Sequence, residues 1–435
     1  MVRRISGKGF VIVTVLAMAL SPFWAGQAGA QRYTPADTDG LIARLGDTDA
    51  AVRLAAVEGL ADIGSNAKPA VLAVAARLSD SDSTVRAAAA GALERIGSEA
   101  NIAVPALIEA LDDRDPSVRW TAAGALGVFT KHGATIVPAL IETLSDPNAS
   151  ARFAAAGSLG KMGSLAVAAL YKVLDGRNLD IRIAAAGALG GIGVHSARAV
   201  PLLIEAMTDL SPDMRRAAAM ALGKIAGGTV WPEERPWNAY TEEYRNEWVF
   251  PKAMTIERRV AEVLELQARV RDTVVPPLAE ALEDSDQTVR FAAARALGNI
   301  GAKAASAAPA LVVALDDDNA DVRRSAARAI GNIEDHALAL LPLAHALADP
   351  DSNVRWAAAR ALSKQGTAAV PILVDALADA NPAVRRIAAQ ALEDIGDGAR
   401  PAIPALTRAA GDTDPDVRIA ANRALEWIAL EMPAE

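Results

Sequence analysis

The clearest pattern along the chain is a pair of short apolar segments separated by a polar turn. Between residues 118 and 128 the apolar side chains fall at Val118, Ala122, Ala125 and Leu126. This i, i+4, i+7, i+8 spacing forms the buried stripe of an amphipathic helix. The pattern predicts a first helix over residues 105–111 and a second helix over residues 118–128, whose alanines permit close packing.

This two-helix unit recurs along most of the chain. The dipeptide Val-Arg, or a close variant, marks the second helix eleven times, and successive arginines are 30–33 residues apart except for one gap of 75 residues. A period in the thirties indicates a solenoid of stacked helix pairs, in which no single unit buries its apolar face alone. The eleven arginines are Arg53, Arg86, Arg119, Arg152, Arg182, Arg215, Arg290, Arg323, Arg355, Arg385 and Arg418.

Residues at fixed distances from each arginine predict both ends of the second helix. Four residues before it stands a side chain that accepts hydrogen bonds from free amides at a helix start: Asp49, Asp82, Asp115, Asn148, Asn178, Ser211, Asp286, Asn319, Asp351, Asn381 and Asp414. Eleven residues after it, seven units carry a glycine that suits a left-handed helix end: Gly64, Gly97, Gly163, Gly193, Gly301, Gly366 and Gly396.

The first thirty residues differ from the rest and predict a cleaved signal peptide. Arg3, Arg4 and Lys8 precede an apolar run over residues 10–20, and small residues follow up to Ala30. This is the layout of a secretory signal, and the run is too short to span a bilayer. We expect cleavage after Ala30, a periplasmic or secreted location, and no transmembrane segment in the mature chain. The paired arginines leave twin-arginine export as an alternative to the general secretory route.

Composition restricts the chemistry available to the chain. It has 44 Lys and Arg against 53 Asp and Glu, and removal of residues 1–30 takes away three basic residues and no acidic one, leaving a net charge of −12. An acidic chain argues against a nucleic-acid partner, which needs a basic footprint. The chain has no cysteine and four histidines, so disulfides and thiolate chemistry are excluded. We predict no metal and no cofactor.

The repeat unit resembles that of the HEAT-repeat family, and its short alanine-rich units are similar to the phycobilisome-lyase-type subgroup. The resemblance implies an all-α, right-handed superhelix of about eleven two-helix repeats with one insertion. It also implies that an aspartate and an arginine of each unit form a ladder between repeats. The matching aspartates lie six residues before each arginine, and only Gly176 departs from them: Asp47, Asp80, Asp113, Asp146, Asp209, Asp284, Asp317, Asp349, Asp379 and Asp412.

The 75-residue gap contains an aromatic-rich insertion. We divide the chain into a signal peptide (1–30), a linker (31–38), repeats 1–6 (39–227), an insertion with an extra helix at 255–271 (228–272), and repeats 7–11 (273–432). Aromatic residues dominate binding hot spots, so the insertion is a candidate partner-binding element; the alternative is a cluster packed on its own solenoid. Its candidate binding residues are Trp231, Trp237, Tyr240, Tyr244 and Trp248.

The resemblance places one face of every second helix on the inner, concave surface. Residues one and five positions past each arginine lie there, one helical turn apart. In the N-terminal half they include Trp120 and Phe153, each paired with a glycine. In the C-terminal half they form an arginine ridge with interleaved aromatics: Arg295, Arg324, Arg328, Trp356, Arg360, Arg386 and Arg423. Arginine suits carboxylate or phosphate recognition; the alternative is pairing with acidic neighbours across repeats.

No catalytic motif is evident in the sequence, so we do not expect an enzyme. The favoured interpretation is an exported scaffold or adaptor that binds a protein or another anionic macromolecule in its concave groove. Two alternatives stay open. One is a lyase-like protein or cofactor chaperone that uses the apolar cleft near Trp120 and Phe153, and the other is a mechanical scaffold of the cell envelope.

Overall fold

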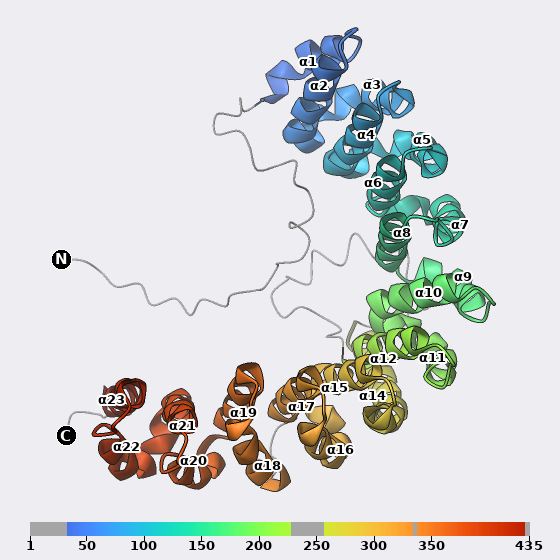
Figure 1. Cartoon of the computed structure of the whole chain (residues 1–435). Helices are drawn as coiled ribbons and strands as arrows, with labels where there is room; N and C mark the ends of the chain where they lie inside the picture. The colour runs from blue at the N-terminus through green and yellow to red at the C-terminus, as the bar shows by residue number, and fades with distance from the viewer. Residues whose placement is uncertain (1–32, 228–255, 334–336, 431–435) are drawn as a thin grey trace, which may run out of the picture.

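The computed structural model describes residues 33–227, 256–333 and 337–430 as an arc of stacked helix pairs (Figure 1). The second helices of the repeats follow one another along the inner side of the arc (Figure 1). They are α2 (Ala50–Ile63), α4 (Ser83–Ile96), α6 (Pro116–Leu126), α8 (Ala149–Lys161), α10 (Leu179–Ile192), α12 (Pro212–Gly227), α15 (Gln287–Ile300), α17 (Ala320–Asn332), α19 (Ser352–Lys364), α21 (Pro382–Ile395) and α23 (Pro415–Leu430).

The first helices form the outer layer of the arc and are mostly shorter (Figure 1). Short 3₁₀ segments such as Gly97–Ala103 connect many of them to the preceding repeat. The first helices are α1 (Thr38–Arg44), α3 (Val71–Ala76), α5 (Val104–Glu109), α7 (Gly133–Thr143), α9 (Ser164–Leu174), α11 (Val200–Ala206), α14 (Ile256–Glu280), α16 (Ala308–Val313), α18 (Leu340–His345), α20 (Val370–Ala376) and α22 (Ile403–Ala409).

Two predicted boundaries differ from those of the structure. Helix α1 begins at Thr38, the last residue of the predicted linker. The helix expected at 255–271 is the first part of α14, which runs without interruption to Glu280. The expected extra helix and the first helix of repeat 7 are therefore one element. Its strong amphipathic pattern continues through the junction, and Pro276 and Pro277 do not end it.

The predicted helix ends are confirmed. The side chain of Asp49 accepts a hydrogen bond of 2.8 Å from the amide of Ala51, and the other ten predicted capping residues make equivalent bonds. All seven glycines predicted at the far end have φ between 59° and 76°. A side chain with a Cβ rarely adopts this conformation, which explains why glycine stands there.

The core is a continuous seam between successive second helices. Alanines dominate this seam, and Ala122 and Ala125 of α6, for example, are fully buried. Glycines that stand two positions after the equivalent of Ala125 in several repeats lie at the contact with the next second helix and allow the closest approach. A Cβ added to Gly223 of α12 would lie 2.4 Å from the Cβ of Ala296 in α15. Stacking therefore buries what no single repeat could bury alone.

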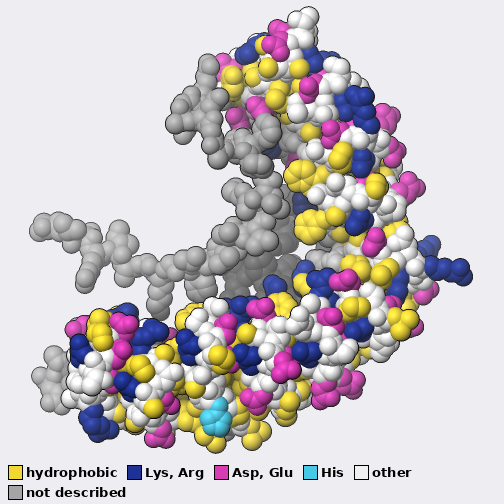
Figure 2. All heavy atoms as spheres, in the orientation of Figure 1, with side chains coloured by type: hydrophobic (Ala, Val, Ile, Leu, Met, Phe, Trp, Pro, Cys, Tyr) yellow, Lys and Arg dark blue, Asp and Glu magenta, His cyan; other side chains and the backbone are white. Residues whose placement is uncertain are grey.

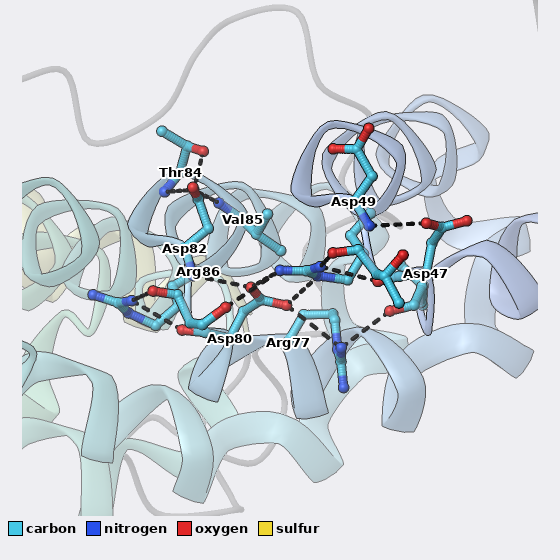
Figure 3. Close-up of polar contacts among 12 residues, drawn as sticks. Asp47, Asp49, Arg77, Asp80, Asp82, Thr84, Val85 and Arg86 are labelled. Atoms are coloured by element: carbon cyan, nitrogen blue, oxygen red, sulfur yellow. Dashed lines mark hydrogen bonds and ion pairs between the residues drawn. The ribbon is translucent and has the colours of Figure 1, made fainter.

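An arginine–aspartate ladder joins neighbouring repeats. Arg53 donates from Nε and Nη2 to the two carboxylate oxygens of Asp80, at 2.8 and 2.6 Å, and its Nη1 donates to the carbonyls of Asp47 and Thr48 (Figure 3). The hydrogen bonds from Arg53 hold the pKa of Asp80 below its usual value. Each such arginine thus fixes the turn of its own repeat and binds the turn of the next one.

The ladder is interrupted at two places among the described residues. Its ion pairs join Arg53 to Asp80, Arg86 to Asp113, Arg119 to Asp146, Arg182 to Asp209, Arg215 to Asp284, Arg290 to Asp317, Arg323 to Asp349 and Arg385 to Asp412. Arg152 and Arg355 bond only to carbonyls of their own turns. The next ladder arginine follows each of them after 30 residues, whereas most other successive ladder arginines are 33 residues apart. After Arg152 the position of the ladder aspartate is occupied by Gly176, which has no carboxylate. After Arg355 the aspartate, Asp379, is present, but the linker before the next first helix is three residues shorter, which shifts the following turn.

Two stretches, Leu179–Ala206 and Gln287–Asp316, are long and apolar enough to cross a membrane by length and composition alone. The bent pair Pro116–Leu126 and Thr130–Thr143 would be a third if it were counted as one span. In the solenoid, the two long stretches are helix pairs joined at Gly193 and Gly301, where φ is positive. Most of their leucines and alanines, such as Leu189 and Leu297, belong to the shared core.

The interruption of the ladder provides a matched test of its contribution to stability. Arg86 and Arg355 both donate Nη1 to carbonyls of their own turn, but only Arg86 also binds a carboxylate of the next repeat. We expect Arg86→Met to lower the free energy of unfolding by roughly 2–4 kcal/mol more than Arg355→Met, because it leaves Asp113 without its partner. Urea denaturation followed by circular dichroism measures this difference. Equal losses in the two variants would contradict it.

Candidate binding groove

The inner side of the arc exposes the two positions that the sequence places in the groove. We number positions within a repeat from its Val-Arg arginine, so that +1 and +5 are one and five residues later. Position +1 is 80% exposed at Phe153 of α8, 42% at Trp120 of α6 and 49% at Trp356 of α19. These large side chains lie on helices of the inner layer and are outside the core (Figure 1).

The arginine ridge also lies on the surface. It consists of the groove arginines of repeats 7–11. Those at position +5 are exposed, and they are Arg295, Arg328, Arg360 and Arg423. Those at position +1 are half-buried, and they are Arg324 and Arg386. Figure 2 shows Lys and Arg side chains along the inner margin of this arm and hydrophobic side chains on the inner margin near α6 and α8. The structure therefore keeps the two halves of the groove chemically distinct.

Trp356 is the centre of the ridge. The guanidinium carbon of Arg360, one turn further along α19, lies 5.5 Å from its ring centroid. The guanidinium carbon of Arg328, from the preceding repeat, lies 5.8 Å from the same ring. Both distances are within the range of a cation–π interaction. The indole thus holds two cations from neighbouring repeats in defined positions.

Acidic neighbours neutralise only part of the ridge. Arg423 pairs with Glu393 of the preceding repeat at 2.8 Å, and Arg324 pairs with Asp321 of its own helix at 2.8 Å. Within the described parts of the chain, Arg295, Arg328 and Arg360 have no carboxylate within salt-bridge distance. The alternative of pairing across repeats therefore holds for Arg423 and not for these three.

Burial and like charges both act on Arg328. Burial lowers the pKa of its guanidinium, and the positive charges of Arg324, Arg360 and Arg295 lower it further. Arginine stays protonated at neutral pH, so these like charges remain close together. A ligand with negative charge would relieve this repulsion.

One groove arginine escaped the sequence prediction. Arg216 occupies position +1 of α12 and pairs with Asp213 at 2.8 Å, in the same way as Arg324 pairs with Asp321. Applying the +1 rule to repeat 6 would have found it. The ridge therefore begins one repeat earlier than expected.

The apolar half of the groove contains a shallow cavity of about 610 Å³ between α8 and α10. Phe153, Ile183, Gly157 and Gly187 line it, and Lys161 and Lys224 are at its rim. The predicted apolar cleft is thus centred on repeats 4 and 5. Trp120, which we expected beside Phe153, is not among the residues that line the cavity.

Two series of glycines on these helices have different environments. Glycines at position +8 contact the next second helix: a Cβ on Gly190 would lie 2.9 Å from the Cα of Ala221, and one on Gly331 would lie 2.9 Å from the Cα of Ala361. Glycines at position +5 face open space, since a Cβ on Gly124, Gly157 or Gly187 would meet nothing within 4 Å. Close helix packing therefore explains why glycine stands at position +8, but it does not explain the glycines at position +5.

Some predicted site residues are outside the described part of the chain. The insertion residues Trp231, Trp237, Tyr240, Tyr244 and Trp248 lie in the undescribed segment 228–255. Among the residues that the structure describes, no group of three or more His, Asp or Glu side chains is arranged to hold a metal ion.

A family model described as HEAT repeats matches six successive segments: residues 38–111, 104–176, 167–235, 255–331, 308–393 and 370–434. The chain belongs to the HEAT-repeat family. The predicted fold class, an all-α superhelix of stacked HEAT repeats, is confirmed. The finer resemblance to phycobilisome-lyase-type repeats stays a prediction.

Several solved structures are similar to this chain at low sequence identity. Yeast importin-β (Kap95p) is 16% identical with a TM-score of 0.62, and the match covers 91% of this chain and 57% of that one. An engineered protein, structural-genomics target OR497, is 24% identical with a TM-score of 0.42 over 90% of this chain and 99% of that one. Karyopherin Kap121p, solved bound to the extreme C-terminus of the protein phosphatase Cdc14p, is 15% identical with a TM-score of 0.48 over 90% of this chain and 45% of that one. No curated protein matches.

The two glycine series predict opposite responses to alanine. Gly157→Ala and Gly187→Ala should each raise the free energy of unfolding by roughly 0.5–1 kcal/mol, because alanine favours the helix and its Cβ meets no atom. Gly223→Ala should lower the stability, since its Cβ would overlap Ala296. Thermal unfolding of the three variants tests this contrast. A loss of stability in the first two would show that their Cβ positions are not open.

Proposed function

We propose that this HEAT-repeat protein is a scaffold or adaptor that binds an anionic segment of a partner protein in its concave groove. The observation that carries the proposal is the cluster of three groove arginines, Arg295, Arg328 and Arg360, that have no carboxylate within salt-bridge distance among the residues the structure describes. Each occupies the same position of successive repeats. The chain as a whole is negatively charged, so its overall composition does not account for a local cluster of positive charge.

The chemistry of the cluster favours carboxylates as the recognised groups. A guanidinium donates two parallel hydrogen bonds to a carboxylate or a phosphate, and its charge assists both. Trp356 positions two of these guanidiniums by cation–π contact. Because the side chains are held before the ligand arrives, less conformational entropy is lost on binding.

The apolar cavity supports a second candidate function, the binding of an apolar small molecule by a lyase-like protein or cofactor chaperone. Its exposed Phe153 and open glycine positions offer a surface that the solenoid itself does not use. This cavity lies on α8 and α10, away from the arginine ridge of repeats 7–11. Substitutions in the ridge therefore separate the two functions.

We also propose that the protein works outside the cytoplasm. Arg3, Arg4 and Lys8, the apolar run over 10–20 and the small residues up to Ala30 support export through a cleaved signal peptide. Expression of the full chain in a bacterial host with fractionation tests this: the mature protein should appear in the periplasm or the medium with Gln31 as its first residue. Full-length protein retained in the cytoplasm would contradict export.

Charge reversal in the ridge tests the adaptor function. We expect Arg295→Glu, Arg328→Glu, Arg360→Glu and Arg423→Glu together to reduce capture of partner proteins from envelope extract at least about tenfold, because repulsion replaces attraction. The readout is quantitative pull-down with the mature chain at two salt concentrations.

A matched control carries four charge reversals on exposed residues of the outer layer: Arg44→Glu, Lys172→Glu, Arg269→Glu and Arg408→Glu. It has the same net charge as the ridge variant and should keep its partners. Unchanged capture by the ridge variant would reject the adaptor function and favour a mechanical scaffold. Circular dichroism of both variants verifies that the solenoid remains folded.

A further inference from the structure

The groove residues of repeats 7–11 form two parallel rows that differ in composition. Position +5 presents an arginine in four of the five repeats, namely Arg295, Arg328, Arg360 and Arg423. The fifth repeat has Gln390 at this position. Position +1 alternates between an apolar residue and an arginine: Phe291, Arg324, Trp356, Arg386 and Ile419. A ligand along the groove would therefore meet a cation at nearly every repeat and an apolar side chain at every second repeat.

Close helix packing determines the spacing of these rows. A Cβ on Gly298 of α15 would lie 3.1 Å from the Cα of Ala329, and one on Gly331 of α17 would lie 2.9 Å from the Cα of Ala361. Helices α15, α17 and α19 therefore approach as closely as packed helices do, with axes about 8–10 Å apart. Since successive +5 residues occupy equivalent positions on these adjacent helices, we expect their cations to be about 8–10 Å apart as well.

This spacing discriminates between backbone conformations of a bound segment. A polyproline II helix has three residues per turn and returns a side chain to the same face about every 9.3 Å. A β-strand does so about every 6.6 Å, which does not match successive cations. An α-helix matches only at its heptad positions, about 10.5 Å apart.

The aromatic residues of the +1 row favour polyproline II over the α-helix. Trp356 is half-exposed, and Arg328 and Arg360 flank its ring. Aromatic-lined grooves dock the rings of proline-rich segments, which bind with little loss of entropy because their conformation is already formed. The apolar side chains at every second repeat are about two turns of such a helix apart.

We infer that the ridge recognises an acidic, proline-containing segment in the polyproline II conformation, with Asp or Glu at every third residue. The carboxylates pair with Arg295, Arg328 and Arg360, while prolines between them contact Trp356. This inference rests on the proposed function, since it names the partner that the same groove would bind.

Three synthetic peptides test the inference with the mature full-length protein. Each has about twelve residues, which in polyproline II conformation span roughly 37 Å, or four repeats. The first has glutamate at every third position and proline elsewhere. The second has the same composition with the glutamates in one block. The third is an alanine-based helix with glutamate at heptad positions. Fluorescence anisotropy of labelled peptides gives the three Kd values.

We expect the first peptide to bind at least about tenfold more tightly than either of the others. Arg328→Gln should weaken it about tenfold or more, while Arg408→Gln on the outer helix α22 serves as the matched control and should leave it unchanged. Trp356→Leu should reduce the preference of the protein for the first peptide over the second.

The outcomes separate this inference from the proposed function. Equal binding of the first two peptides, abolished by Arg328→Gln, would overturn the spacing rule but would still support a cationic groove that binds an anionic segment. Tighter binding of the helical peptide would overturn the polyproline II conformation. Absence of binding by all three peptides, together with unchanged capture by the charge-reversed ridge variant, would overturn both.

Discussion

Contact between successive second helices is the constraint on which the rest of the structure depends. Alanines such as Ala122 and Ala125, and glycines such as Gly223 and Gly331, bring the helices so close that a single added Cβ would overlap the neighbour at the glycine positions. This contact leaves little freedom for a repeat to rotate relative to the next. Interiors packed to this density transmit a fixed geometry along the stack. The arginine–aspartate ladder then joins the turns at one end of most helix pairs.

The same constraint explains why the groove is available for function. Position +5 faces open space at Gly124, Gly157 and Gly187, so its side chain can vary without disturbing the core. Position +1 lies at the edge of the core, where Ile183 and Phe291 pack against it and Phe153 and Trp356 are exposed. Repeats 3–5 carry aromatic or aliphatic residues with glycines there, and repeats 7–11 carry arginines. Because every repeat is in register with the next, a substitution at one of these positions adds a group at a defined place in a row. Chemistry in the groove is thereby separated from stability in the core.

Electrostatics distinguishes two kinds of arginine in this chain. The ladder arginines have their donors used by carbonyls and by carboxylates of the next repeat, and they are structural. The ridge arginines Arg295, Arg328 and Arg360 are exposed and near one another, and in the described ranges of the chain no carboxylate lies within salt-bridge distance of them. Whether an arginine forms an ion pair with a carboxylate in the structure therefore distinguishes the structural arginines of the ladder from the candidate binding arginines of the ridge.

The sequence alone determined the architecture, because helix caps in all eleven units, apolar spacing and positive-φ glycines in seven of the units are local signals repeated in register. It located the ends of the second helices, the ladder residues from Asp80 to Asp412, and the groove positions of Trp356 and Phe153. It indicated the failure of the ladder after Arg152, where Gly176 stands in place of the aspartate. It did not reveal that α14 is continuous, that the ladder fails after Arg355, or which ridge arginines have no carboxylate within salt-bridge distance in the described parts of the chain. Those properties depend on distances between residues of different repeats. Only the tertiary structure sets them, since a three-residue difference in a linker changes which side chains meet.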